Sequence, residues 1–126
     1  MTTTRPTWHD WALGDAKIFR NPGGRITPQA LEALVLGVHL LKVNRILIVL
    51  HTKCAMASST EAQIHESVSF GWPRMRLGKC FSVIDDQRAA LVNDVRIVIT
   101  HPLIPDSTVV GRFIYDVDTG LLEQTA

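Results

Sequence analysis

Apolar residues follow two different patterns in the first half of the chain. Residues 46–50 form a continuous, branched apolar run, which is typical of a strand buried on both faces of a parallel sheet. We therefore expect residues 45–50 to be a central, fully buried parallel strand. Between residues 28 and 42, apolar side chains recur every three or four positions. This spacing predicts an amphipathic helix with Thr27 as its N-cap and Pro28 at its first position.

The segment before this helix predicts a short strand and a tight turn. Residues 16–20 have the composition of a strand. Asn21, Pro22, Gly23 and Gly24 are a strong turn signal, because glycine allows positive φ and close approach of the backbone. Strand, turn, helix and strand in this order predict a βαβ unit with a right-handed crossover.

The middle of the chain predicts two further helices with a loop between them. Ser58 and Glu61 fit a capping box for the first of these helices. Residues 69–82 contain glycine and proline and predict a loop. Asp85 and Asp86 place negative charge at the start of the second helix, where the helix dipole favours it.

The last third of the chain predicts the end of that helix and two strands. Residues 96–100 are β-branched and by propensity prefer strand, but we predict that they continue the helix. We then expect a strand at 109–117, a turn at 118–120 and a return strand at 121–123. Together these elements predict an α/β fold in a single domain that spans residues 1–126.

Composition limits the classes of partner. The chain has 126 residues, of which 46% are hydrophobic and 20% are charged, as expected for one compact soluble domain. A net charge of +1 gives no electrostatic surface for nucleic acid or an anionic membrane. The apolar stretches are too short to span a bilayer, and the N-terminus lacks the apolar core of a secretory signal.

Cysteine usage favours a reduced compartment. Two cysteines in a chain of this size do not make a disulfide scaffold, so the cytoplasm is the expected location. The N-terminus is rich in hydroxyl side chains and carries Arg5 without nearby acids, which leaves a mitochondrial transit peptide as a weaker alternative.

The candidate chemistry is a pair of side chains directly after the first apolar strand. His51 and Cys54 are good zinc ligands, and ligands in open α/β sheets bind just beyond the carboxyl ends of strands. The pair is half of a zinc site, which needs four ligands; a buried core histidine and a buried thiol are the alternative. Lys53 either lowers the pKa of the Cys54 thiol or points to water. Other side chains could supply the missing ligand: Cys80, His9, Asp10, His65 and Asp15.

Several segments resemble one known family. Residues 20–25, R-N-P-G-G-R, resemble the R-N-A-G-G segment of β-class carbonic anhydrases. A helix, an apolar strand and His51-x-x-Cys54 then follow in the order that this family requires. Residues 101–105 and 111–122 look like the C-terminal strand and turn of its small bacterial and fungal members. The resemblance covers residues 13–123.

This resemblance implies a fold, a cofactor and an activity. It implies a mostly parallel central sheet flanked by helices, a homodimer or larger assembly, and one zinc per chain held by Cys, His and Cys. His51 and Cys54 would be two of these ligands, and Asn21, Gly23 and Gly24 would line the substrate cavity. The implied reaction is the reversible hydration of carbon dioxide to bicarbonate by a zinc-dependent lyase, a carbonate dehydratase.

The sequence departs from the family pattern in one respect. The first ligand lies in a C-x-D-x-R motif upstream of the glycines, and this sequence has no cysteine before Cys54 and no such motif. No residue matches the family's catalytic Asp–Arg pair; Arg25 could at most place a guanidinium near the cavity. We expect an N-terminally shortened chain, or a degenerate paralogue, whose activity is impaired.

Two other functions remain open at this point. One is a catalytically inactive chain that acts as a binding or dimerisation partner. The other is hydrolysis of carbonyl sulfide or carbon disulfide, which related proteins on this fold perform with the same metal. Trp8 and Trp11 have little local core to enter, so we expect them to pack against another subunit.

Overall fold

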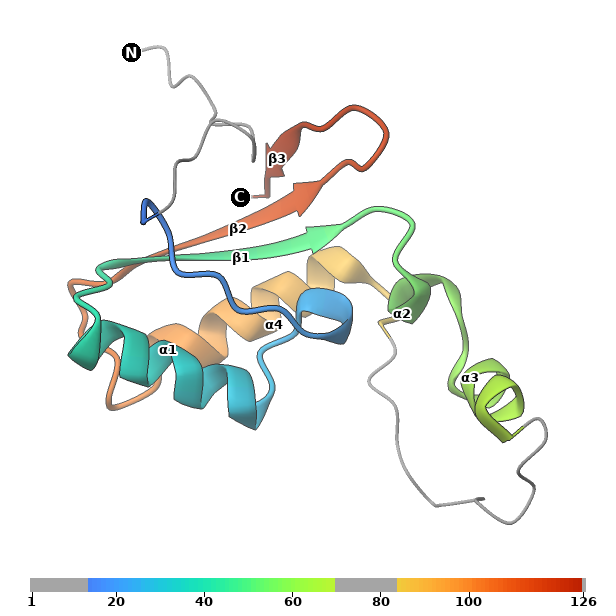
Figure 1. The fold of residues 1–126 in the computed structure, drawn as a ribbon, viewed down its shortest axis with the longest axis horizontal. Helices are drawn as coiled ribbons and strands as arrows, with labels where there is room; N and C mark the ends of the chain where they lie inside the picture. Colours follow the sequence, from blue (N-terminus) through green and yellow to red (C-terminus); the bar gives the residue numbers. More distant parts are fainter. Residues whose placement is uncertain (1–13, 70–83, 126) are drawn as a thin grey trace.

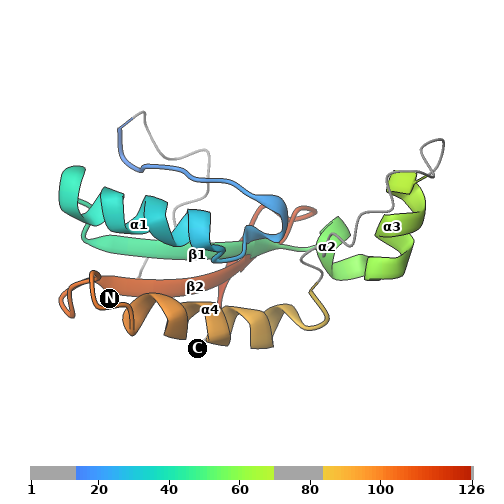
Figure 2. The same ribbon diagram turned by 90° about the horizontal axis from the view of Figure 1, so that it is seen from below.

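The computed structural model describes residues 14–69 and 84–125, and it has an α/β architecture. Helices α1 and α4 lie side by side on one face of a three-stranded sheet with the order β1-β2-β3 (Figures 1 and 2). The elements in chain order are η2 (Pro22–Gly24), α1 (Pro28–Leu40), β1 (Arg45–His51), α2 (Ala55–Ser58), α3 (Glu61–Ser69), α4 (Gln87–Ile99), β2 (Val109–Tyr115) and β3 (Leu122–Gln124). The predicted fold class is therefore confirmed.

The core lies between the sheet and these two helices. β1 pairs in parallel with β2, from Arg45 opposite Val109 to His51 opposite Tyr115, and β3 returns antiparallel to β2. Alternate residues of β1 (Ile46, Ile48 and Leu50) point into the core with Leu91 and Val98 of α4. Burying these side chains on a single sheet face is what holds the layers together.

The prediction that β1 is central and buried on both faces is wrong for the described residues. Its burial alternates, and Leu47 on the face away from the helices is 45% exposed. The reason is that α1 and α4 cover only one face, and β1 stands at the edge of the described sheet. An apolar run alone does not tell how many layers will cover it.

The predicted strand at 16–20 is also wrong. These residues form no ladder, and Ile18 and Phe19 are exposed. The predicted βαβ unit therefore does not exist; the parallel crossover instead joins β1 to β2 through α2, α3 and α4. The predicted helix is confirmed at its start, where Thr27 Oγ1 accepts from the amide of Ala30, and it ends at Leu40, two residues early.

Of the two helices predicted in the middle of the chain, the first begins with a different capping pair and the second is confirmed. The capping box of α3 is formed by Thr60 and Gln63, whose side chains bond each other's amides, and not by Ser58 and Glu61. Ser58 belongs to α2 and donates to the carbonyl of Cys54 instead. Asp86 caps α4, and α4 continues to Ile99 as predicted.

The C-terminal strands and turn follow the prediction closely. β2 ends two residues before the predicted limit of 117, a turn covers residues 117–119, and β3 begins one residue late. The loop predicted at 69–82 lies almost wholly outside the described residues. Within the described ranges, no helix combines the length and the apolar character needed to cross a membrane.

Candidate metal and substrate site

The structure places His51 and Cys54 at the carboxyl end of β1, as predicted. His51 is the last residue of β1 and is exposed, whereas Cys54 is 5% exposed and is the N-cap residue of α2. The short connection between them is fixed by neighbours from other elements. The amide of Thr52 donates to the carbonyl of Tyr115 at 2.8 Å, and Gln87 Nε2 donates to the carbonyl of His51 at 2.8 Å.

The hydrogen bond of the His51 ring engages one of its two nitrogens. Nδ1 lies 2.7 Å from the carbonyl oxygen of Thr52. A carbonyl can only accept, so the neutral ring carries its proton on Nδ1 and leaves the lone pair of Nε2 free. A backbone carbonyl on the second ring nitrogen is the usual way in which a protein orients a metal-binding histidine.

The described residues contain two of the candidate zinc ligands and not a complete set. Imidazole nitrogen and thiolate sulfur are donors that zinc prefers, and both lie at one end of one strand. Within residues 14–69 and 84–125, no three metal-binding side chains gather at one point. His9, Asp10 and Cys80 lie outside the described residues. Asp15 belongs to no such group, and the side chain of His65 is not described.

The glycine turn, residues 21–24, lies against the same end of β1. It closes with a bond of 3.2 Å from the amide of Gly24 to the carbonyl of Asn21, and Asn21 Nδ2 donates to the carbonyl of Arg25. Gly24 has φ +66°, and a Cβ there would lie 2.8 Å from the carbonyl oxygen of Val49. No side chain fits at this position, because the backbone of the turn touches the backbone of β1.

Gly23 joins the turn to α2. Its φ is +79°, and a Cβ there would lie 3.0 Å from Ile84 Cδ1 and 3.4 Å from the Cβ of Met56. Ile84 is itself held by its amide, which donates to the carbonyl of Met56 at 2.7 Å. The turn therefore lies between β1 and the short helix that begins directly after Cys54.

An ion pair that the sequence did not reveal ties this turn to α4. Arg25 Nε and Nη2 donate to the two carboxylate oxygens of Asp94 at 2.8 and 3.0 Å, and the amide of Ile26 adds a third bond at 3.1 Å. Asp94 is fully buried. The hydrogen bond to Asp94 raises the pKa of Arg25, burial opposes this, and the charge of Asp94 adds to it. Arg25 is therefore engaged by Asp94.

The sequence does indicate that Asp94 is buried. Leu91, Asp94 and Val98 are spaced as neighbours on one helical face, and the two apolar members mark that face as buried. A carboxylate in such a row needs a charged partner. Its partner lies 69 residues away in sequence, however, and no local pattern identifies it.

Lys53 forms an ion pair with Asp118. Its Nζ lies 2.9 Å from a carboxylate oxygen of Asp118, in the turn that follows β2. Both side chains are more than 60% exposed, so this pair contributes little to stability. The hydroxyl of Thr52 accepts from the amide of Val117 and joins the same two loops. The connection after β1 is thus bonded to the turn after β2.

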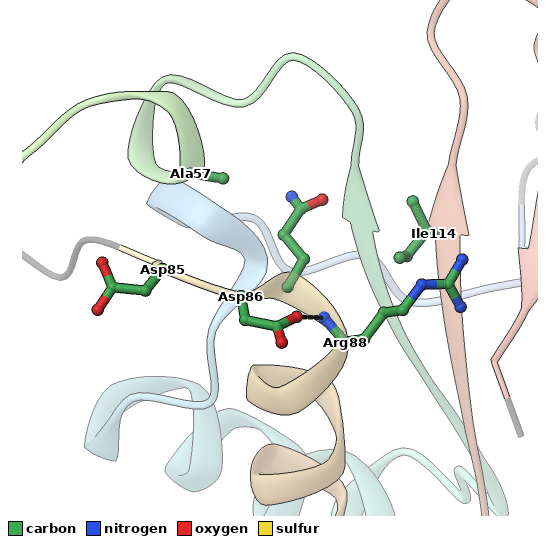
Figure 3. A pocket seen from close by; sticks show the side chains of 6 residues that line it. Ala57, Asp85, Asp86, Arg88 and Ile114 are labelled. Carbon is green, nitrogen blue, oxygen red and sulfur yellow. Dashed lines mark hydrogen bonds between the residues drawn. The ribbon is translucent and has the colours of Figure 1, made fainter.

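A shallow pocket of about 440 Å³ lies next to this site. It is lined by residues of α2, of β2 and of the start of α4: Ala57, Asp85, Asp86, Gln87, Arg88 and Ile114. Figure 3 shows Arg88 extending toward β2 while Asp86 caps its backbone. Gln87 connects this pocket to His51 through the bond to the His51 carbonyl. Asn21, Gly23 and Gly24 are not among the lining residues.

Comparison with known proteins gives a consistent result. No protein-family model matches the chain. A solved carbonic anhydrase from Streptococcus mutans is 30% identical and superposes with a TM-score of 0.84, over 94% of this chain and 71% of that one. A β-carbonic anhydrase 1 from Mycobacterium tuberculosis is 25% identical over 88% of this chain and 68% of its own length.

The chain has a similar sequence identity to proteins whose names give a different substrate. A carbon disulfide hydrolase from Acidithiobacillus thiooxidans is 29% identical over 86% of this chain. The chain spans 63% of the length of that hydrolase, and 56% and 65% of two others.

Proposed function

The chain belongs to the β-carbonic anhydrase family, and from this we propose that it binds zinc through His51 and Cys54 and serves the hydration of a small linear substrate. The observation that supports the proposal is the placement of His51 and Cys54 at the carboxyl end of β1, beside the glycine turn. This is where an open α/β sheet places its ligands. The reduced cytoplasm is part of the proposal, because Cys54 must remain a thiol to bind metal.

Each residue of the site has a separate task. His51 offers Nε2 because the Thr52 carbonyl holds the proton on Nδ1. Cys54 offers its sulfur from a buried position at the start of α2. We propose that Asn21, Gly23 and Gly24 act as part of the cavity wall, where the two glycines let the turn pack directly against β1 and α2. Zinc, when bound, would lower the pKa of a water to about 7 and so supply a nucleophile near neutral pH.

We propose carbon dioxide as the substrate, with bicarbonate as the product. Carbon disulfide and carbonyl sulfide are the second possibility, and the similarity to carbon disulfide hydrolases supports it. All three molecules are linear, and each has an electrophilic central carbon that hydroxide can attack. The substrates differ mainly in the size and polarity of the terminal atoms. We therefore propose that the size and polarity of the cavity wall determine which substrate binds.

A function of another class is a catalytically inactive chain that acts as a binding partner. It is kept as the second candidate because no group of three metal-binding side chains is found among the described residues. A catalytic zinc needs three protein ligands and an open position. The measured rate of carbon dioxide hydration distinguishes the enzyme from the inactive binding partner.

We predict that these 126 residues, loaded with zinc, hydrate carbon dioxide at close to the uncatalysed rate. The reason is that these residues match two of the family's three zinc ligands and neither member of its Asp–Arg pair, so the proposed hydration requires a third ligand that this match does not supply. Stopped-flow measurement with a pH indicator tests this, with release of hydrogen sulfide from carbon disulfide as a parallel assay. A fast zinc-dependent rate that Cys54→Ser abolishes would establish the enzyme and exclude the inactive alternative.

We also propose that the chain forms a homodimer or larger assembly. The sheet face away from α1 and α4 is apolar, with Leu47 45% and Val109 60% exposed. Such a face and a free strand edge both favour association. We predict that light scattering at micromolar concentration gives a mass of at least two chains, and that Trp8→Ala with Trp11→Ala lowers it. Both tryptophans lie outside the described residues. A stable monomer would contradict this prediction.

A further inference from the structure

Asp94 binds the two residues that directly follow the glycine turn. It is fully buried in the middle of α4, and it accepts three hydrogen bonds, all from residues 25 and 26. The two bonds from Arg25 are parallel and engage both oxygens, which fixes the orientation of the guanidinium as well as its distance. The chain directly after Gly24 is therefore locked onto α4.

The glycine turn contacts the chain on both sides of the residue that we assign to the metal. Gly24 lies against the carbonyl of Val49 and within contact distance of the Leu50 side chain. Gly23 lies against Met56, two residues after Cys54. Cys54 is one of the buried residues of this region although it stands at the end of a strand and the start of a four-residue helix. The turn therefore packs on the residues that precede and follow this connection.

We propose that Asp94 is a positioning residue: through Arg25 it holds the glycine turn against the carboxyl end of β1, and so keeps Cys54 covered and in place. The proposal rests on the proposed function only in treating Cys54 as a metal ligand. In this proposal Asp94 lies in α4, outside the site, and controls the geometry of the site. The raised pKa of Arg25 is consistent with this role, since the guanidinium stays charged at neutral pH.

The test measures the accessibility of Cys54 directly. In a Cys80→Ser background, Cys54 is the sole thiol of the chain. Its rate of labelling with Ellman's reagent is measured without denaturant in the parent protein and in Asp94→Ala and Asp94→Asn. The matched control is Val98→Ala, because Val98 is also fully buried on α4 but is not among the partners of the turn. Global stability of each variant is measured by urea unfolding.

We expect Asp94→Ala to label about tenfold faster than the parent, because local opening of the turn exposes Cys54 without global unfolding. Asp94→Asn should lie between the two, since the amide keeps an oxygen acceptor but loses the charge. Val98→Ala should label faster only in proportion to its unfolded fraction. If the labelling of Asp94→Ala also follows its unfolded fraction, Asp94 is a structural residue and the proposal is wrong.

A second variant tests the proposal in case Asp94→Ala does not fold. Arg25→Lys keeps the positive charge and lacks the two-pronged contact, and Arg25 is only partly buried. We expect it to label faster than the parent; labelling at the parent rate would overturn the proposal. Cadmium titration, followed by thiolate-to-metal absorption, is run on the same proteins. If the parent gives no such absorption while labelling responds as expected, the assigned metal role fails and the positioning role stands.

Discussion

Gly24→Ala should destabilise the protein by about 2–5 kcal/mol, from the strain of a left-handed residue and the cost of overpacking. Two features of this position add up. Its φ is +66°, which L-residues rarely adopt, and a Cβ would lie 2.8 Å from the carbonyl oxygen of Val49. That oxygen belongs to the backbone of β1, which cannot move without disturbing its pairing with β2. Urea unfolding followed by circular dichroism measures the loss.

Gly120→Ala is the matched control for this prediction. Gly120 has nearly the same φ, +72°, but the nearest atom to its Cβ position is the Tyr115 hydroxyl at 3.8 Å, an ordinary contact. It therefore carries the conformational cost alone, about 1–2 kcal/mol. Equal losses in the two variants would show that the contact with Val49 does not matter. A larger loss at Gly24 assigns the difference to the packing of the turn on β1.

Helix limits were predictable because their signals are local. Thr27 before Pro28, and Asp86 before α4, are caps whose side chains bond amides two or three residues away. The same reasoning placed the wrong pair at the start of α3. There Thr60 and Gln63 compete with Ser58 and Glu61, and the sequence does not show that Ser58 is already part of α2.

Burial was not predictable in the same way. The apolar run of β1 predicts a strand correctly, but Leu47 is exposed because the helices that pack on the sheet lie on one face. Which face a helix covers depends on the path of the chain between elements. That path is a property of the whole fold, and periodicity within one segment does not contain it.

The residues of the candidate site also differ in how far the sequence indicates them. His51 and Cys54 could be identified from their position after a strand, and the glycines from their turn signal. The residues that hold them in place could not: Gln87 bonds the His51 carbonyl from 36 residues away, and Asp94 bonds Arg25 from 69 residues away. Such pairs bring distant residues together only after the layers have packed. The sequence therefore indicates the candidate ligands, but it does not indicate the residues that pack around them.

The second large effect is expected at Cys54. We predict that zinc added to the purified chain binds through Cys54 and His51, and that Cys54→Ser lowers the zinc retained after gel filtration to background. The physical reason is the donor: the serine hydroxyl stays protonated near neutral pH, whereas thiolate sulfur is the preferred zinc ligand, at about 2.3 Å. Elemental analysis measures the metal content, and X-ray absorption identifies the sulfur.

The neighbouring residue provides the control for the metal prediction. Lys53→Ala removes a side chain that is adjacent in sequence but bonded to Asp118. It should keep the zinc content of the parent, because it removes no ligand and only an exposed ion pair. Equal zinc in Cys54→Ser and the parent would remove Cys54 from the site. The buried thiol would then be a core residue at the start of α2, and the proposed zinc function would lose its main ligand.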